Sequence, residues 1–339
     1  MALIDWWVVA AYLIGMLLLA SWLGRSQGSR NDYYLAGGSL PAPALAVSIL
    51  ATQCSTNSLL GAPAFVGFAA GGGLLWLQYE LAVPLAMLVL VVLFPLVYRY
   101  RPISVYAVLE ARLGRSARLV ASGCFLFSRG VGTGITAYGV ASILALVMNV
   151  DYLTAIVLLM GVTIAYDVLG GMRAVVVSDV MQMVLLIAAV LIALGDLAPS
   201  LAAQHVALAE RTASLLDDWG VTGNSDYGFW PMLFGGLFLY VAYYGFDQSQ
   251  AQRLLSASDD RALRRILLLN GLLRFPLVLA YCILGLGLAA YALEHPGFLS
   301  ALPTTEQGDP NINLVFPYYV LEAFPAGLAG LAIVGLFAA

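Results

Sequence analysis

Long apolar runs separated by short polar segments dominate the chain. The hydrocarbon core of a membrane is about 30 Å thick, so a helix needs about 20 apolar residues to cross it. We predict nine such spans, at residues 4–23, 43–68, 75–98, 117–147, 152–170, 174–196, 229–251, 263–292 and 317–339. Because lipid offers no water to backbone amides and carbonyls, these runs favour α-helices. The pattern therefore predicts an all-α integral membrane protein with one transmembrane domain over residues 1–339.

The last apolar run stops at Ala339 without a cap, a basic flank or a polar tail. A natural chain seldom ends at membrane depth. We therefore expect the protein to continue beyond this residue.

The arginines predict how the bundle is oriented. All 15 basic residues are Arg. If the N-terminus is extracytoplasmic, twelve of them fall in inner loops and only Arg211 in an outer loop, while Arg129 and Arg274 lie inside spans. Basic residues concentrate in cytoplasmic loops, so we predict a multi-pass protein of the cytoplasmic membrane with its N-terminus outside. The segments 197–228 and 293–316 then become extracytoplasmic loops.

Composition narrows the class of function. Hydrophobic residues make up 62% of the chain and charged residues 10%, with a mean hydropathy of +0.91, which is too apolar for a water-coated surface. A net charge of −4 gives no basic footprint for nucleic acid. The sequence carries no nucleophile–base pair, glycine-rich phosphate loop or metal-ligand cluster, so we predict no enzyme, no catalytic residue and no cofactor. The expected partners are the lipid bilayer and a small molecule, and the sequence gives no indication of the oligomeric state.

The middle of the second span is unusually polar. Residues 52–58 carry seven hydroxyl, amide or thiol side chains in a row. One interpretation is a broken helix whose freed carbonyls bind a cation and whose side chains bind a solute near the membrane midplane. The alternative is a hydrogen-bonding patch that only holds helices together. We favour the broken helix, because helix packing does not need so many consecutive polar residues.

Among the carboxylates within the spans, three stand out, because ionisable groups there are costly and are functional by default. We expect Glu80 to lie on a solute pathway. Asp179 is predicted either to bind a cation or to pair with Arg173. Asp247 is close to the inner interface, and solvation there is the favoured interpretation.

Two arginines also lie within spans. Arg274 is about nine residues past the inner loop, too deep for its side chain to reach the interface easily. Together with Arg129 it could hold a solute carboxylate, since a guanidinium binds a carboxylate through two parallel hydrogen bonds. The alternative for Arg274 is an ion pair with Glu80 or another internal acid.

Four stretches carry a recognisable pattern. They are residues 32–40 (DYYLAGGSL), the polar segment 52–58, residues 170–182 (GGMRAVVVSDVMQ), and residues 245–248 (GFDQ) followed by Gln252 and Arg253. In these stretches the sequence resembles the sodium/solute symporter family, which includes sodium-coupled sugar, proline, sialic-acid, iodide and monocarboxylate transporters. The third stretch is the most specific, being close to the family signature GG-(L/M)-(K/R)-AVVWTDV-Q.

The sequence departs from the family pattern at three positions. Gly38 stands where many members have Arg, and Val177 and Ser178 stand where the signature has Trp and Thr.

The resemblance implies a five-plus-five inverted-repeat transporter fold with an extra N-terminal helix at residues 4–23. Residues 43–196 would form the first repeat. Residues 229–339 would form a second repeat that is truncated in this chain.

The resemblance also implies a sodium site. The family's principal site uses backbone carbonyls of the first broken helix, at positions that match Ala51 and Cys54, and a carbonyl of the second repeat that matches Ala339. The hydroxyl ligands would come just after residue 339. Asp179 matches an Asp close to a second sodium site in some members.

Solute contacts implied by the resemblance come from the polar break, a Tyr-Glu pair in the next helix, aromatics of a second broken helix and a basic residue in the helix after it. These positions are Gln53, Ser55, Ser58, Tyr79, Glu80, Tyr243, Tyr244 and Arg274. Arg129 has no counterpart in most members, and in sialic-acid carriers the Arg that binds the substrate carboxylate falls about one turn later, near Gly132. We predict Arg129 as a carboxylate ligand from its place within a span and not from the resemblance.

The predicted function is sodium-coupled symport of a small organic solute, which we expect to be a carboxylate. The coupling ion is sodium. The rival hypothesis is a solute-sensing membrane module of a transporter-like protein fused to a kinase, in which solute binding signals.

Overall fold

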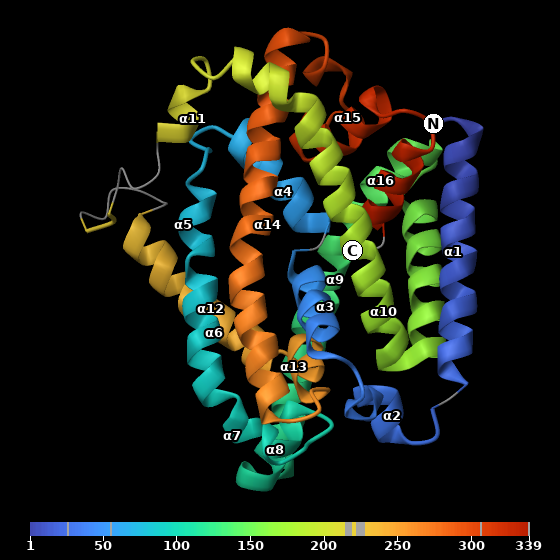
Figure 1. Ribbon diagram of the computed structural model, residues 1–339, viewed down its shortest axis with the longest axis vertical. Helices are drawn as coiled ribbons and strands as arrows, with labels where there is room; N and C mark the ends of the chain where they lie inside the picture. The colour runs from blue at the N-terminus through green and yellow to red at the C-terminus, as the bar shows by residue number, and fades with distance from the viewer. Residues whose placement is uncertain (26, 55, 214–218, 222–227, 306, 338–339) are drawn as a thin grey trace.

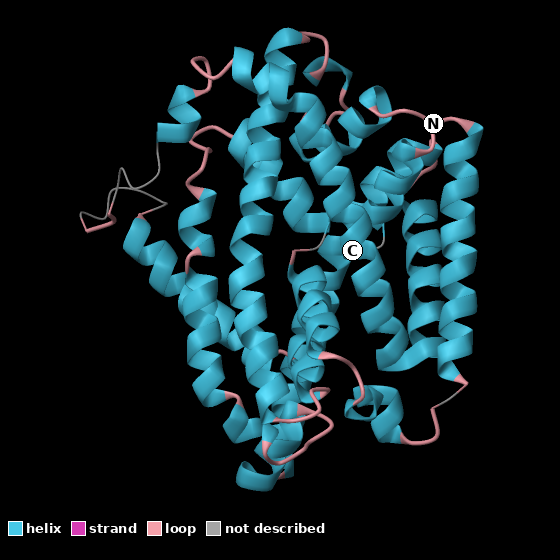
Figure 2. Ribbon diagram, in the orientation of Figure 1, coloured by secondary structure: helices cyan, strands magenta, loops and turns pink. Residues whose placement is uncertain are grey.

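The computed structural model describes residues 1–25, 27–54, 56–213, 219–221, 228–305 and 307–337 (Figure 1). Within these ranges every regular element is a helix, apart from an isolated β-bridge between Thr304 and Pro310 (Figure 2). The helices run roughly side by side as one bundle, as an all-α membrane protein requires.

Six helical segments of the described chain are long and apolar enough to cross a membrane, or seven if a bent pair formed by residues 30–53 counts as one. Three of the expected spans appear here nearly unchanged as α1 (Leu3–Gly24), α9 (Arg115–Met148) and α14 (Asp260–Glu294). A fourth, Trp76–Tyr98, comprises α5 (Trp76–Glu80), α6 (Ala82–Leu93) and α7 (Pro95–Tyr98). The remaining two are α10 (Tyr152–Ala203) and α12 (Phe229–Phe246).

The long element α10 contains the two spans expected at 152–170 and 174–196, joined by a sharp turn at Gly171. Gly171 has φ 56° and ψ −161°, a conformation that is essentially restricted to glycine. The chain reverses there, so the first half of α10 lies beside α1 and the second half returns through the bundle (Figure 1). A Cβ on Gly171 would come within 2.8 Å of the Tyr33 carbonyl oxygen and of Gln27 Oε1.

Two of the predicted spans are divided within their length. The span at 43–68 is divided into α3 (Ala42–Gln53) and α4 (Thr56–Gly67), as the broken-helix hypothesis predicted. The span at 229–251 ends as α12 at Phe246, and α13 (Gln248–Leu255) begins after Asp247.

The prediction of one continuous span at 317–339 was wrong. The structure has α15 (Val315–Ala323) and α16 (Leu328–Phe337) with a bend between them. Pro325 cannot donate a helical hydrogen bond, and Gly327 has φ +90°, so the helix cannot continue through this point.

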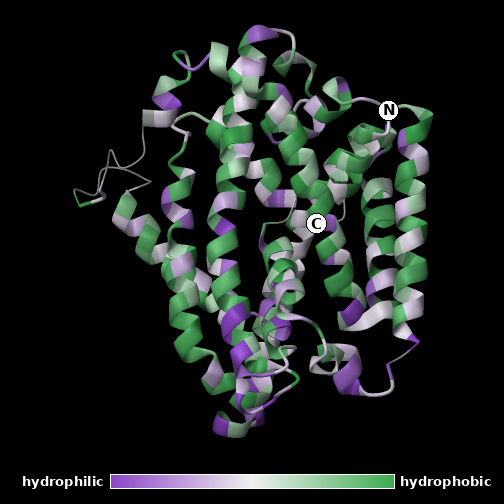
Figure 3. Cartoon of the chain, in the orientation of Figure 1, coloured by the Kyte–Doolittle hydropathy of each residue, from purple (hydrophilic) through white to green (hydrophobic). Residues whose placement is uncertain are grey.

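The two ends of the bundle differ in composition. One end carries α2 (Arg30–Leu35), η1 (Ala36–Gly38), α8 (Val105–Leu113) and α13, together with the turn at Gly171 (Figure 1). We call this the arginine-rich end, because it holds the arginines at 25, 30, 99, 101, 112, 115, 118, 173, 253, 261, 264 and 265. The opposite end carries α11 (Ala209–Ala213), η2 (Leu299–Ala301), η3 (Ile312–Leu314) and α15. Figure 3 shows apolar residues covering the length between the ends.

Helix α14 lies in the interior and packs against α3, α4, α6 and α10. Helix α1 packs against α10 and α16 at one side of the bundle. This arrangement brings the middle of α14 directly against the α3–α4 break.

Because Gly171 has both a glycine-only conformation and no room for a Cβ, we expect Gly171→Ala to lower the free energy of unfolding by at least about 1–3 kcal/mol. Gly161→Ala is the matched control in the same element, since a Cβ there meets no atom within 4 Å. Thermal unfolding of the two variants in detergent measures the difference. Equal midpoints would show that the turn tolerates a side chain.

Candidate solute and sodium site

The break between α3 and α4 falls within the polar segment 52–58. Helix α3 ends at Gln53, and Cys54 leaves the helical conformation with φ −90° and ψ 45°. A helix that ends leaves the carbonyls of its last turn without helical partners. Ala51 and Cys54 are buried at this point. Ser55 and Ala339, also predicted as site residues, lie outside the described residues.

Helices from later in the chain contact this break. Tyr281 of α14 donates a hydrogen bond to the Cys54 carbonyl (3.3 Å), and Arg274 Nη1 donates to Cys54 Sγ (3.2 Å). Thr56, the first residue of α4, donates to the Leu336 carbonyl in the last turn of α16. The break is therefore enclosed by α14 and α16.

Arg274 forms a buried ion pair with Glu80, which confirms the alternative proposed for it. Nε lies 2.7 Å from Oε2 and Nη2 lies 2.9 Å from Oε1, and the two side chains are 3% and 2% exposed. The Tyr240 hydroxyl bridges both partners, and the guanidinium stacks 5.4 Å from the Tyr240 ring centre. In this conformation the guanidinium is engaged by Glu80 rather than presented to a solute.

Asp179 is paired with Arg253 of α13, at 2.9 Å between Oδ2 and Nη2. Ser48 of α3 joins them, accepting from Arg253 Nε at 2.6 Å and donating to Asp179. The predicted ion pair of Asp179 with Arg173 was wrong, because Arg173 Nη2 instead donates to Ser39 Oγ. The cluster ties α3, α10 and α13 together near the arginine-rich end.

Asp247 is not simply solvated, as had been favoured. Its Oδ2 lies 2.7 Å from Arg129 Nε, and the Arg129 guanidinium stacks 4.9 Å from the Tyr243 ring centre. Asp247 also accepts from the amide and hydroxyl of Ser249, so it caps α13. Arg129 remains 32% exposed, and its Nη2 has no hydrogen-bond partner among the residues that the structure describes.

A polar cavity of about 320 Å³ lies between α3, α9, α10 and α13, on the arginine-rich side of the break. It brings together three predicted residues, Ala51, Arg129 and Asp179. The rest of its polar lining comes from α3, α9, α10 and α13. These residues are Thr52, Thr133, Thr136, Thr163, Tyr166, Asp167, Ser178 and Arg253.

The predicted aromatic residues lie mostly elsewhere. Tyr79 packs 5.0 Å from Tyr240, on the side of Glu80 and Arg274. Tyr244 is fully buried, and Tyr243 accepts a hydrogen bond from Gln250. Gln53 and Ser58 lie at the break, where the Ser58 hydroxyl donates to the Gln53 carbonyl at 3.1 Å.

A second polar cavity, of about 250 Å³, lies on the other side of the break between α4, α9 and the segment around η3. Asn57, Tyr138 and Asn311 are among its lining residues. Asn57 Nδ2 donates to Thr136 Oγ1 at 3.0 Å, and Thr136 lines the first cavity. The two cavities thus approach each other along α9 with this hydrogen bond between them.

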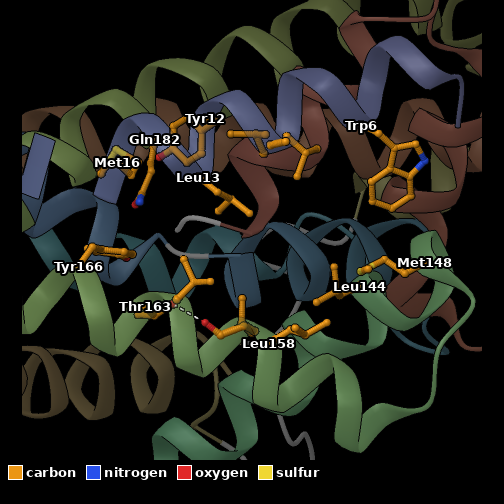
Figure 4. A pocket seen from close by; sticks show the side chains of 15 residues that line it. Trp6, Tyr12, Leu13, Met16, Leu144, Met148, Leu158, Thr163, Tyr166 and Gln182 are labelled. Atoms are coloured by element: carbon orange, nitrogen blue, oxygen red, sulfur yellow. Dashed lines mark hydrogen bonds between the residues drawn. The ribbon is translucent and has the colours of Figure 1, made fainter. Parts of the chain in front are cut away.

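A third cavity, of about 300 Å³, has a different character (Figure 4). It lies between α1, α9, α10 and Val334 of α16 and is lined mainly by apolar side chains such as Leu13, Met16 and Leu144. No charged side chain of the described residues lines it. It is therefore unsuited to an ion or to a polar solute.

A sodium:solute symporter family profile matches residues 33–339 of this sequence. This chain belongs to the sodium:solute symporter family. The predicted resemblance is confirmed, and the chain is a multi-pass membrane protein of a transporter family rather than an enzyme.

Curated relatives within the symporter family have different solutes. The sequence is 28% identical to the sodium/iodide cotransporter of Homo sapiens over 78% of this chain and 42% of the relative. It is 28% identical to the sodium/sialic acid symporter of Proteus mirabilis, over 99% and 67%. It is 29% identical to the sodium-coupled monocarboxylate transporter 1 of Mus musculus, over 93% and 52%. The chain thus spans about two fifths to two thirds of the length of these relatives.

The fold is also that of a solved symporter. A structure described as the substrate-bound outward-open state of a Na⁺-coupled sialic acid symporter superposes with a TM-score of 0.87, over 99% of this chain and 69% of that one, at 23% identity. The likeness covers the breaks and the bundle that surrounds them.

Sequence reasoning missed several polar residues of this symporter-family chain. Asp167 lines the first cavity. The sequence already held the signal for it, because Asp167 is an ionisable residue within the predicted span 152–170, which is the criterion by which Glu80 was chosen. Gln78 is fully buried beside Tyr79, and within the described part of the chain neither polar atom of its side-chain amide has a hydrogen-bond partner. Arg253 was assigned to a loop, and only the fold brings it to Asp179.

Removing one partner of the buried Glu80–Arg274 pair leaves a charge uncompensated, which costs roughly 3–5 kcal/mol. We therefore expect Glu80→Gln and Arg274→Gln each to lower the thermal unfolding midpoint strongly, and the double variant to recover a large part of the loss. A double-mutant cycle measured by thermal unfolding in detergent tests the coupling. Additive losses would mean that the two side chains act independently.

Proposed function

We propose that this chain forms the sodium and solute-binding core of a secondary active symporter for a small organic anion. The observation that carries the proposal is the α3–α4 break with a polar cavity on each side of it, within a fold of the sodium:solute symporter family. Binding sites near the midplane at broken helices, approached from either side in turn, are the basis of alternating access. The five-plus-five inverted repeat, over 43–196 and 229–339, remains part of this proposal.

Sodium is proposed to bind at the break. The ligands would be the carbonyls of Ala51 and Cys54, with Ala339 as a third, and Asp179 would serve a neighbouring cation position. Ala51 and Asp179 line the same cavity, which supports this assignment. Carbonyl and carboxylate oxygens provide the hard ligands that such a cation prefers.

The solute carboxylate is proposed to bind at Arg129 in the first cavity. Arg274 is fully engaged by Glu80, whereas Arg129 is partly exposed, lines the cavity and is held by a single carboxylate oxygen of Asp247. A solute carboxylate can displace or share that contact with two parallel hydrogen bonds. Thr133 and Thr136 lie on the same helix as Arg129 and line the same cavity. Their hydroxyls would form hydrogen bonds with the other polar groups of the solute.

Coupling follows from linkage between the two sites. If sodium binds one conformation better, it raises the population of that conformation, and a solute that binds the same conformation gains affinity. The gain is reciprocal, so each ligand strengthens the other. Names of relatives that include sialic acid and monocarboxylates support an anionic solute for this chain as well.

We expect the full-length protein in detergent to be stabilised against heat by one class of carboxylate, and only when sodium replaces potassium. The stabilisation follows the ratio of ligand concentration to Kd, about 2.7 kcal/mol at a hundredfold excess. The measurement is a thermal-shift panel of carboxylates, neutral amino acids and sugars in each salt.

Each other outcome of this panel is informative. A shift that is the same in sodium and potassium would contradict coupling and favour a sensing role. A sodium-dependent shift with sugars or neutral amino acids only would contradict the choice of a carboxylate.

Arg129→Gln is expected to weaken the apparent affinity for the anionic solute by at least about tenfold, because it removes a charge-assisted hydrogen-bonding group. Arg129→Lys should be intermediate, since Lys is a point charge without the planar fork. Arg118→Gln is the control, because Arg118 lies on α9 like Arg129 but forms an exposed ion pair with Glu110. Solute KM in sodium-driven uptake is the readout, and an unchanged KM in Arg129→Gln would remove Arg129 from the site.

A further inference from the structure

Asp5 is a buried carboxylate of α1, a span in which the sequence predicted no role for any charged residue. It lies in the first turn of α1, yet only 1% of it is exposed. Its Oδ1 accepts hydrogen bonds from the amides of Gly327 (2.7 Å) and Gly330 (2.8 Å), and its Oδ2 accepts from the amide of Ala2 (2.7 Å). No arginine among the described residues forms an ion pair with it. Its charge is therefore stabilised by backbone amides, two of them from the far end of the sequence.

The two glycine amides belong to the start of α16. The first amides of a helix have no partner within the helix and form its positive end, so a carboxylate placed there is stabilised by both effects. Here the carboxylate comes from another helix, some 320 residues away in sequence. Asp5 therefore acts as a cap between helices, which joins α1 to α16.

Contacts along α16 leave it little freedom to move away from this cap. A Cβ on Gly330 would come within 2.8 Å of Asp5 Cα and 2.9 Å of the Asp5 carbonyl oxygen, so α1 and α16 touch through their backbones. On its other side, a Cβ on Gly335 would meet the amide of Leu186 in α10 at 3.1 Å. Helix α16 is thus held between α1 and α10 at backbone distance (Figure 1).

The far end of α16 reaches the α3–α4 break. The Leu336 carbonyl accepts a hydrogen bond from Thr56, which is the first residue of α4. A helix of ten residues is about 15 Å long. A rigid element of this length therefore has the Asp5 carboxylate at one end and the break at the other.

From this geometry we propose that Asp5 is a positioning residue for sodium binding: α1 holds α16 in register with the α3–α4 break through the Asp5 carboxylate. The inference rests on the proposed function, in which the break carries the sodium site. In this proposal Asp5 does not itself bind sodium. It fixes the position of α16, whose last turn forms part of the wall of the site.

The test is a sodium titration, against potassium at constant ionic strength, of the thermal stability of the full-length protein in detergent, with no solute present. Asp5→Asn keeps the shape of the side chain but removes the charge and one acceptor. We expect its sodium midpoint to rise roughly three- to tenfold, the scale of losing a helix cap. Gly330→Ala disturbs the same contact between α1 and α16 from the α16 side, and it should also raise the sodium midpoint.

The matched control is Asp151→Asn. Asp151 is an exposed aspartate that caps its own helix, α10, through the Thr154 amide, without joining two helices. It should lose some stability at an unchanged sodium midpoint. A merely structural role for Asp5 predicts the same pattern for Asp5→Asn: a lower unfolding temperature and an unchanged midpoint.

The outcomes separate this inference from the proposed function. If the wild-type protein responds to sodium and both Asp5→Asn and Gly330→Ala keep its midpoint, the positioning role is wrong and the symporter proposal stands. If the wild-type protein does not distinguish sodium from potassium, the proposed function fails and this inference fails with it. A raised midpoint in both variants, with Asp151→Asn unchanged, supports the positioning role.

Discussion

The structure depends on one constraint, that backbone polar groups at membrane depth must find partners within the protein. The α3–α4 break violates the simplest solution, a continuous helix, close to the middle of the bundle. A neighbouring helix compensates, since Tyr281 of α14 donates to the Cys54 carbonyl. The Thr56 hydroxyl at the start of α4 in turn donates to the Leu336 carbonyl in the last turn of α16. A break of this kind exists only because α14 and α16 enclose it, so the site and the packing of the bundle cannot be separated.

The buried charges follow the same logic. Three charge pairs in the described interior are formed across helices: Glu80 with Arg274, Asp179 with Arg253, and Asp247 with Arg129. The pairs differ in exposure, from 2–3% for the first to 18–32% for the last. A sealed pair costs much to open and contributes structure, whereas a partly exposed pair beside a cavity can exchange a partner at little cost. This gradient is what distinguishes Arg274, which holds the bundle, from Arg129, which faces the cavity.

Some of this was predictable from residue order alone. The number of polar residues in 52–58 predicted the break, because that many hydroxyls and amides cannot face lipid. The motif at 170–182 predicted the family, and Gly170-Gly171 fell between two apolar runs, where the chain turns. The bend at Pro325 and Gly327 was missed, although proline and glycine together mark a helix end, because the apolar run continued through them.

The sequence by itself determined the membrane class, most of the helical spans, the family and the position of the break, because these follow from hydrophobic length and from local residue type. Only the tertiary structure decided the partners of the charges: Arg253 rather than Arg173 for Asp179, Arg129 for Asp247, and the amides of α16 for Asp5. Ion pairing depends on which helix faces which at a separation of a few ångströms. The partners of these two ion pairs are 74 and 118 positions apart and meet only after the bundle has packed. Periodicity along one helix carries no information about that distance.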